Sequence, residues 1–160
     1  STFTGQNMGA GKFDRIKKGV LWGHVILTTI WAAELIAGYL IGDRILLLFL
    51  TEEDLAVVRD PSMLAIYCFA WGQFFLTTVQ VCRLAIQGMS YSKLALVAGL
   101  IEMAARALCG LIGVPKYGFL AACLAPPAAW LLVDPFLIVA FIVCFRKRRA
   151  EYAAKGLLKD

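Results

Sequence analysis

Two residues of opposite charge, Glu102 and Arg106, lie in the middle of an apolar stretch of the sequence. Four positions apart, they share one face of a helix, with the acid nearer the N-terminus as a helical ion pair prefers. A charged side chain at the centre of a bilayer costs on the order of 2.5 to 3.5 kcal/mol, so such residues usually face a protein interior or a water-filled path. The sequence leaves two roles open: a charge clamp between helices, or a proton or cation carrier at Glu102.

Glu34 is a second acid within an apolar stretch, and no basic residue lies three or four positions from it. Its partner could be Arg83 or Arg106 from another helix, or its carboxyl group could hold a proton, because a low dielectric disfavours the charged form. Arg83, one turn before Gln87, lies near the end of a further apolar stretch, where a long side chain can reach the headgroups. The candidate residues of an ion or substrate pathway are Glu34, Arg83, Gln87, Glu102 and Arg106.

The apolar stretches that hold these residues are long enough to cross a membrane. Hydrophobic residues make up 61% of the 160 residues and charged residues only 17%, which is more apolar than a soluble domain of this length. A helix crosses the hydrocarbon layer with about 20 apolar residues. We predict an all-α integral membrane protein with four transmembrane helices at residues 20–41, 62–87, 93–113 and 119–145, and a basic tail at 146–160. Three prolines in the fourth span predict a kink or a break there.

The charged residues of the loops predict the orientation, because Lys and Arg collect on the cytoplasmic side. Four basic residues lie between positions 12 and 18, and four more between 146 and 149. The linker of about 20 residues between the first two spans, by contrast, is rich in acids, among them Glu52, Glu53 and Asp54. We predict a multi-pass protein of the plasma membrane with both ends in the cytoplasm.

Several function classes are disfavoured by the residue pattern. The five cysteines lie within the predicted spans without a CxxC pair, and His24 is the only histidine, so we expect no metal site. The basic run at 146–149 directly follows an apolar span, which favours a membrane anchor over a nucleic-acid contact. No nucleophile with its base and no cofactor loop can be assembled. We therefore predict no enzyme, no catalytic residues, no cofactor and no nucleic-acid partner; the lipid bilayer is the expected surroundings.

Four sequence elements resemble segments of the multidrug and toxic compound extrusion (MATE) transporters. Their order along the chain is that of the family: the segment from Gln6 to Gly19, Arg83 with Ile86 to Ser90, Glu102 to Arg106, and Pro127 to Trp130. The resemblance covers nearly the whole chain. It departs from some members at Leu76 and Thr77, where those members place an acid.

The resemblance implies a twelve-helix transporter of two lobes, in which residues 1–160 form the C-terminal part of the C-lobe and Ser1 to Thr4 end helix eight. It implies efflux of amphipathic or cationic drugs and toxic compounds by antiport, with H⁺ or Na⁺ as the coupling ion. The expected partners are such small substrates and the remaining helices of the transporter. The alternative is a free-standing four-span protein, either a small multidrug antiporter or a structural membrane subunit.

The predicted orientation can be tested with single cysteines in a background that lacks the five native ones. Because the linker should face outward, a cysteine at Glu53 should react with an impermeant thiol reagent added to intact cells. A cysteine at Lys155 should react only after the cells are opened. Labelling of Lys155 with protection of Glu53 in intact cells would reverse the orientation.

Overall fold

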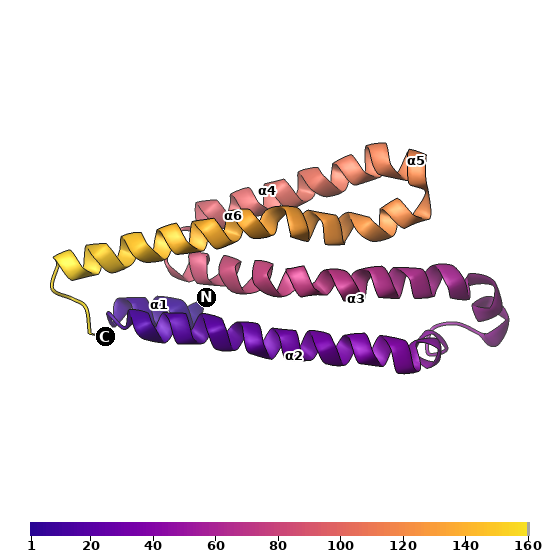
Figure 1. The fold of residues 1–160 in the computed structure, drawn as a ribbon, viewed down its shortest axis with the longest axis horizontal. Helices are drawn as coiled ribbons and strands as arrows, with labels where there is room; N and C mark the ends of the chain where they lie inside the picture. The colour runs from indigo at the N-terminus through magenta and orange to yellow at the C-terminus, as the bar shows by residue number, and fades with distance from the viewer. Residues whose placement is uncertain (160) are drawn as a thin grey trace.

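The computed structural model describes residues 1–159, and these are almost wholly helical (Figure 1). The elements are α1 (Thr2–Gly9), α2 (Phe13–Leu46), α3 (Glu52–Gly88), α4 (Ser92–Leu108), the π-helix η1 (Cys109–Gly113), α5 (Val114–Tyr117) and α6 (Phe119–Ala154). Because α4, η1 and α5 follow one another without a gap, the chain has four helices long and apolar enough to cross a membrane. The predicted all-α class with four transmembrane helices is confirmed.

The long helices lie side by side in the order α2, α3, α6, α4, counting α4 with η1 and α5 (Figure 1). α3 contacts α2 on one side and α6 on the other, while α4 packs against α6. The first and last described residues lie at the same end of the bundle. The basic residues at the start of α2 and at the end of α6 therefore share one end, and the acidic residues at the start of α3 lie at the other.

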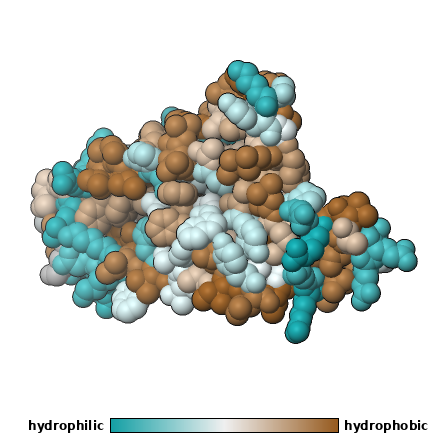
Figure 2. Space-filling model, turned by 45° about the vertical axis from the view of Figure 1, so that its right-hand side comes forward, coloured by the Kyte–Doolittle hydropathy of each residue, from teal (hydrophilic) through white to brown (hydrophobic). Residues whose placement is uncertain are grey.

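The surface is broadly apolar, as expected of helices that face lipid. Large side chains such as Leu40, Leu111 and Leu132 are exposed on three different helices, and Figure 2 shows apolar side chains over much of the face that it draws. In water this exposure would be unfavourable by about 25 cal/mol per Å² of apolar surface. A bilayer removes that penalty.

Two clusters of buried side chains hold the bundle together. The larger joins α3, α4 and α6, and consists of Val79, Cys82, Ile86, Ala98, Trp130, Val133, Leu137 and Ala140. The smaller lies near the chain ends, where the ring of Phe13 meets Phe145 edge to face at 5.6 Å and Tyr152 at 5.2 Å. This second cluster attaches the start of α2 to the end of α6.

The linker predicted between the first two spans is much shorter in the structure. α2 continues to Leu46, although Ile41, where the predicted first span ends, has non-helical backbone angles (φ −131°, ψ 15°) and marks a kink, and α3 begins at Glu52. Helix on both sides of this kink therefore replaces most of the expected loop. Thr51 caps α3 by accepting a hydrogen bond from the Asp54 backbone N–H at 3.2 Å, and the acids that follow it favour a helix N-terminus. The prediction treated loss of hydrophobicity as the end of the helix, but capping and charge extend the helix beyond the bilayer.

The fourth helix also differs from its prediction. α6 runs from Phe119 to Ala154 as one helix through all three prolines, so of the predicted kink or break, the break is wrong. Each proline removes one backbone hydrogen bond while the hydrogen bonds on either side persist. The basic segment after residue 145 is helical up to Ala154 and is no loose tail. Arg148 anchors it by donating to the Met89 carbonyl oxygen at 3.2 Å and pairing with Glu151 at 2.9 Å.

Gly72 marks a close approach of α3 to α6. A Cβ atom at this position would lie 2.5 Å from Cγ and 3.1 Å from Cα of Pro127, and the proline ring cannot turn away. We expect Gly72→Ala to lower the free energy of unfolding by about 1 to 3 kcal/mol, the usual cost of overpacking. Denaturant unfolding in detergent micelles would measure it.

Gly99→Ala is the matched control, since no atom lies within 4 Å of a Cβ built there. That change should be neutral or should stabilise the helix by up to about 1 kcal/mol. Equal losses at Gly72 and Gly99 would contradict a close contact between α3 and α6.

Candidate transport site

Glu102 lies between two arginines from different helices. Arg83 of α3 donates from Nη2 to Glu102 Oε1, and Arg106, one turn further along α4, has Nη2 at 3.5 Å from Oε2. The Glu102 side chain is only 12% exposed. The cluster therefore joins α3 to α4 by compensated charge within the apolar part of the bundle.

This arrangement changes the interpretation of Arg83. The sequence favoured a side chain that reaches the headgroups, but Arg83 instead turns inward to Glu102, because an acid within reach compensates its charge without the need for water. The predicted pairing of Glu102 with Arg106 is present, although Arg83 is the closer partner. Gln87 is exposed and lies outside the cluster.

Arg106 also connects the cluster to α6. Its guanidinium carbon lies 5.9 Å from the ring centroid of Trp130, a distance at which the ring face attracts a cation. Trp130 belongs to the larger buried cluster, so packing holds its ring in place beside Arg106.

Glu34 lies apart from these charges, on α2. It is exposed and borders a cavity of about 130 Å³ whose other walls are Leu27, Ile30, Trp31, Gln73, Leu76, Thr77 and Gln80. Within residues 1–159 its carboxyl group has no hydrogen bond or ion pair, so neither of the two arginines considered from the sequence is its partner. The Glu34 carboxylate is thus open to a ligand or an ion.

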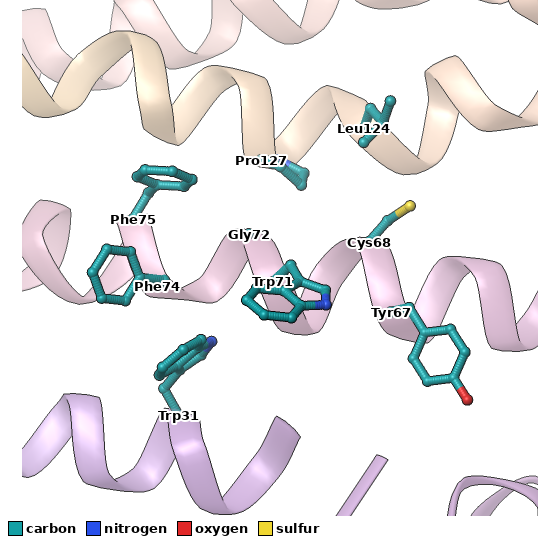
Figure 3. A pocket seen from close by; sticks show the side chains of 9 residues that line it. All are labelled: Trp31, Tyr67, Cys68, Trp71, Gly72, Phe74, Phe75, Leu124 and Pro127. Atoms are coloured by element: carbon teal, nitrogen blue, oxygen red, sulfur yellow. The ribbon is translucent and has the colours of Figure 1, made fainter. Parts of the chain in front are cut away.

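A larger cavity of about 590 Å³ adjoins it between α2, α3 and α6 (Figure 3). Its walls are mostly aromatic: Trp31, Tyr67, Cys68, Trp71, Gly72, Phe74, Phe75, Leu124 and Pro127. In Figure 3, Trp31 rises from α2 toward α3, while Leu124 and Pro127 descend from α6. Trp31 borders both cavities, so the aromatic cavity and the Glu34 carboxylate are neighbours.

Hydrogen bonds hold the aromatic rings of this cavity in place. Trp31 Nε1 donates to the Ala70 carbonyl oxygen at 2.6 Å, and its ring lies 5.2 Å from that of Phe74. Trp71 Nε1 donates to the Tyr39 hydroxyl at 3.2 Å. The sequence analysis missed this cavity, although the helical spacing of the aromatic residues from Tyr67 to Phe75 was a signal for a shared face.

Asp134 is a further acid within the fourth apolar stretch. It is buried in the middle of α6 between Val133 and Leu137 of the larger cluster. Its Oδ1 atom has no hydrogen-bond partner in the described part of the chain.

The family model described as MatE matches residues 1–112, well over half of the chain. The chain belongs to the MatE family. Comparisons with curated proteins and with solved structures found no match.

MatE proteins carry out efflux of multidrug and toxic compounds across membranes, and they are transporters rather than enzymes. With four membrane-spanning helices, this chain is a multi-pass membrane protein. The match does not favour the alternative of a free-standing small antiporter or structural subunit. The matched region contains Glu34, the aromatic residues of α3 and the Glu102 cluster, whereas Trp130 and Asp134 lie beyond it.

The charge cluster of this MatE chain makes a prediction about stability. Glu102→Gln leaves two arginines facing each other in the apolar interior, so we expect it to lower the free energy of unfolding by about 3 to 5 kcal/mol, the usual cost of breaking a buried ion pair. Adding Arg83→Gln should restore part of that loss, since the second change removes one of the two uncompensated charges and leaves only that of Arg106. Unfolding of both single variants and the double variant in detergent would give the coupling energy.

The control for this comparison of single and double variants is the exposed pair of Arg59 and Asp43. These two residues meet at 2.8 Å at the other end of the bundle. Water screens that pair, so its coupling energy should be clearly smaller. A coupling of Arg83 with Glu102 no larger than that of Arg59 with Asp43 would show that the cluster does not act as a buried clamp.

Proposed function

We propose that this chain is the C-terminal part of a two-lobed, twelve-helix transporter of the plasma membrane, which exports amphipathic cationic compounds in exchange for H⁺ or Na⁺. The observation that carries the proposal is the aromatic cavity that shares Trp31 with the cavity of Glu34. One site thus offers an apolar surface for the body of a substrate and a carboxylate for its charge.

The aromatic cavity has the size and chemistry that such compounds need. Its volume of about 590 Å³ lies within the range of roughly 300 to 1,000 Å³ typical of sites for small molecules. Tryptophan and phenylalanine rings attract cations to their faces by about 0.5 to 2 kcal/mol. The wide opening formed by exposed Trp71 and Phe74 suits ligands of varied shape.

Glu34 is the carboxylate that we assign to coupling. Leu76 and Thr77, which by resemblance stand where some family members carry an acid, border the same cavity as Glu34. In this chain the acid of that cavity comes from α2 instead of α3. Competition between a substrate cation and H⁺ or Na⁺ for one carboxylate would couple their opposite movements.

Glu102 is less suited to that role. Two guanidinium groups already compensate its charge, and their positive charge repels a further cation. We assign Glu102 and Arg83 to positioning α3 against α4, and we assign Gln87 to the entrance of the pathway. The orientation we propose has both chain ends in the cytoplasm, because the end of the bundle that carries the basic segments is then inside.

The coupling role of Glu34 predicts the behaviour of Glu34→Gln. Glutamine keeps the shape of the side chain but cannot exchange a proton or bind a cation by charge. Efflux of ethidium from vesicles with an imposed proton gradient should become independent of pH, or independent of Na⁺ if Na⁺ is the coupling ion. Phe74→Leu should instead weaken ethidium binding by about threefold to tenfold, the loss of one cation–π contact, with the ion dependence retained.

Glu53→Gln, at the exposed start of α3, is the matched control and should leave both properties unchanged. Wild-type dependence on both pH and Na⁺ in an abundant, stable Glu34→Gln protein would exclude Glu34 as the coupling acid. Unchanged ethidium binding in Phe74→Leu would exclude the aromatic cavity as the binding site for ethidium.

A further inference from the structure

The cluster of Arg83, Glu102 and Arg106 does not balance its own charge. It holds two guanidinium groups and one carboxylate, and within residues 1–159 no other acid pairs with either arginine. Its net charge is therefore +1. Charges inside membrane segments almost always have a partner, so one negative charge is missing.

The depth of Arg106 restricts where that charge comes from. The continuous helix that carries it runs from Ser92 to Tyr117. At 1.5 Å per residue, Arg106 lies about 21 Å from the first end and about 16 Å from the second. Lipid phosphates lie at the two surfaces of the hydrocarbon layer, about 30 Å apart, and are out of reach of a side chain at this depth.

Both arginines retain hydrogen-bond donors without acceptors. Arg83 Nε is buried and has no partner in the described chain. Arg106 makes one long contact of 3.5 Å to Glu102, and 47% of its side chain is exposed. A guanidinium group has five N–H donors in a planar fork. The guanidinium carbon of Arg106 lies 5.9 Å from the ring centroid of Trp130, and the exposed part of the side chain is open to a ligand.

We propose that this cluster is a binding site for one further carboxylate, received by Arg106. A carboxylate fits the planar fork with two parallel hydrogen bonds, and one such group brings the cluster to neutrality. Two sources supply the same chemistry. One is a carboxylate solute that enters along a water-filled path; the other is an acidic side chain of a transporter segment that packs on α4.

The change in melting temperature caused by Arg106→Gln shows whether a further carboxylate is bound to the cluster. If a further carboxylate is bound, Arg106→Gln leaves that carboxylate unpaired, and the melting temperature falls. If none is bound, the same change leaves the balanced pair of Arg83 and Glu102 and loses only the 3.5 Å contact to Glu102 and the contact with Trp130, so the melting temperature changes little or rises. Arg106→Lys retains the charge and tests whether the planar contact with Trp130 accounts for the effect instead.

The experiment uses the purified transporter, expressed from its own gene, in lipid nanodiscs with sodium benzoate as the probe. Benzamide, which has the same shape without the charge, is the control ligand. Lys116→Gln is the control variant, since Lys116 is an exposed cation at the far end of the same helix. Melting temperatures are measured for each variant with and without each ligand, and no transport assay is needed.

A solute site is shown by two results together. Benzoate, but not benzamide, raises the wild-type melting temperature, and Arg106→Gln raises the benzoate concentration needed for the same shift by about tenfold or more. Lys116→Gln leaves that concentration unchanged. A side-chain source is shown if benzoate has no effect, Arg106→Gln lowers the melting temperature, and Arg106→Lys restores most of it. The proposal is overturned if benzoate has no effect and Arg106→Gln is neutral or stabilising. It is also overturned if, without a benzoate effect, Arg106→Lys is as damaging as Arg106→Gln.

Discussion

The absence of water inside the hydrocarbon layer is the constraint on which the rest of the structure depends. Every backbone polar group there needs a partner within its own helix, which explains why helices cover nearly all of residues 1–159. The same constraint governs the side chains. Arg83 turns inward to Glu102 because an unpaired charge at that depth is costly.

α3 connects the regions that bear on transport. It provides most of the wall of the aromatic cavity, one wall of the cavity beside Glu34, and the arginine that reaches α4. Its contact with α6 at Gly72 sets the distance across the aromatic cavity. A shift of α3 relative to its neighbours would therefore alter the aromatic cavity and the charge cluster together.

The amino-acid sequence was sufficient to predict the fold class and the approximate spans. Runs of about 20 apolar residues have few alternatives to membrane helices, and the element from Glu102 to Arg106 could be assigned to one helical face because spacing alone decides that. Helix ends were predicted less well. α2, α3 and α6 continue past their apolar runs, since capping at Thr51 and polar contacts such as that of Arg148 with Met89 maintain helix outside the bilayer.

The sequence by itself thus determined which segments cross the membrane, which end carries the positive charge, and which charged residues lie at depth. The tertiary structure decided which of them meet. Arg83 pairs with Glu102. Within residues 1–159, Glu34 stands beside an aromatic cavity without a hydrogen-bond or ion-pair partner, and Asp134 is buried with one unbonded oxygen. These relations depend on how each helix is rotated against its neighbours. When a helix is apolar on all faces, its hydrophobic pattern does not predict which face meets which neighbour.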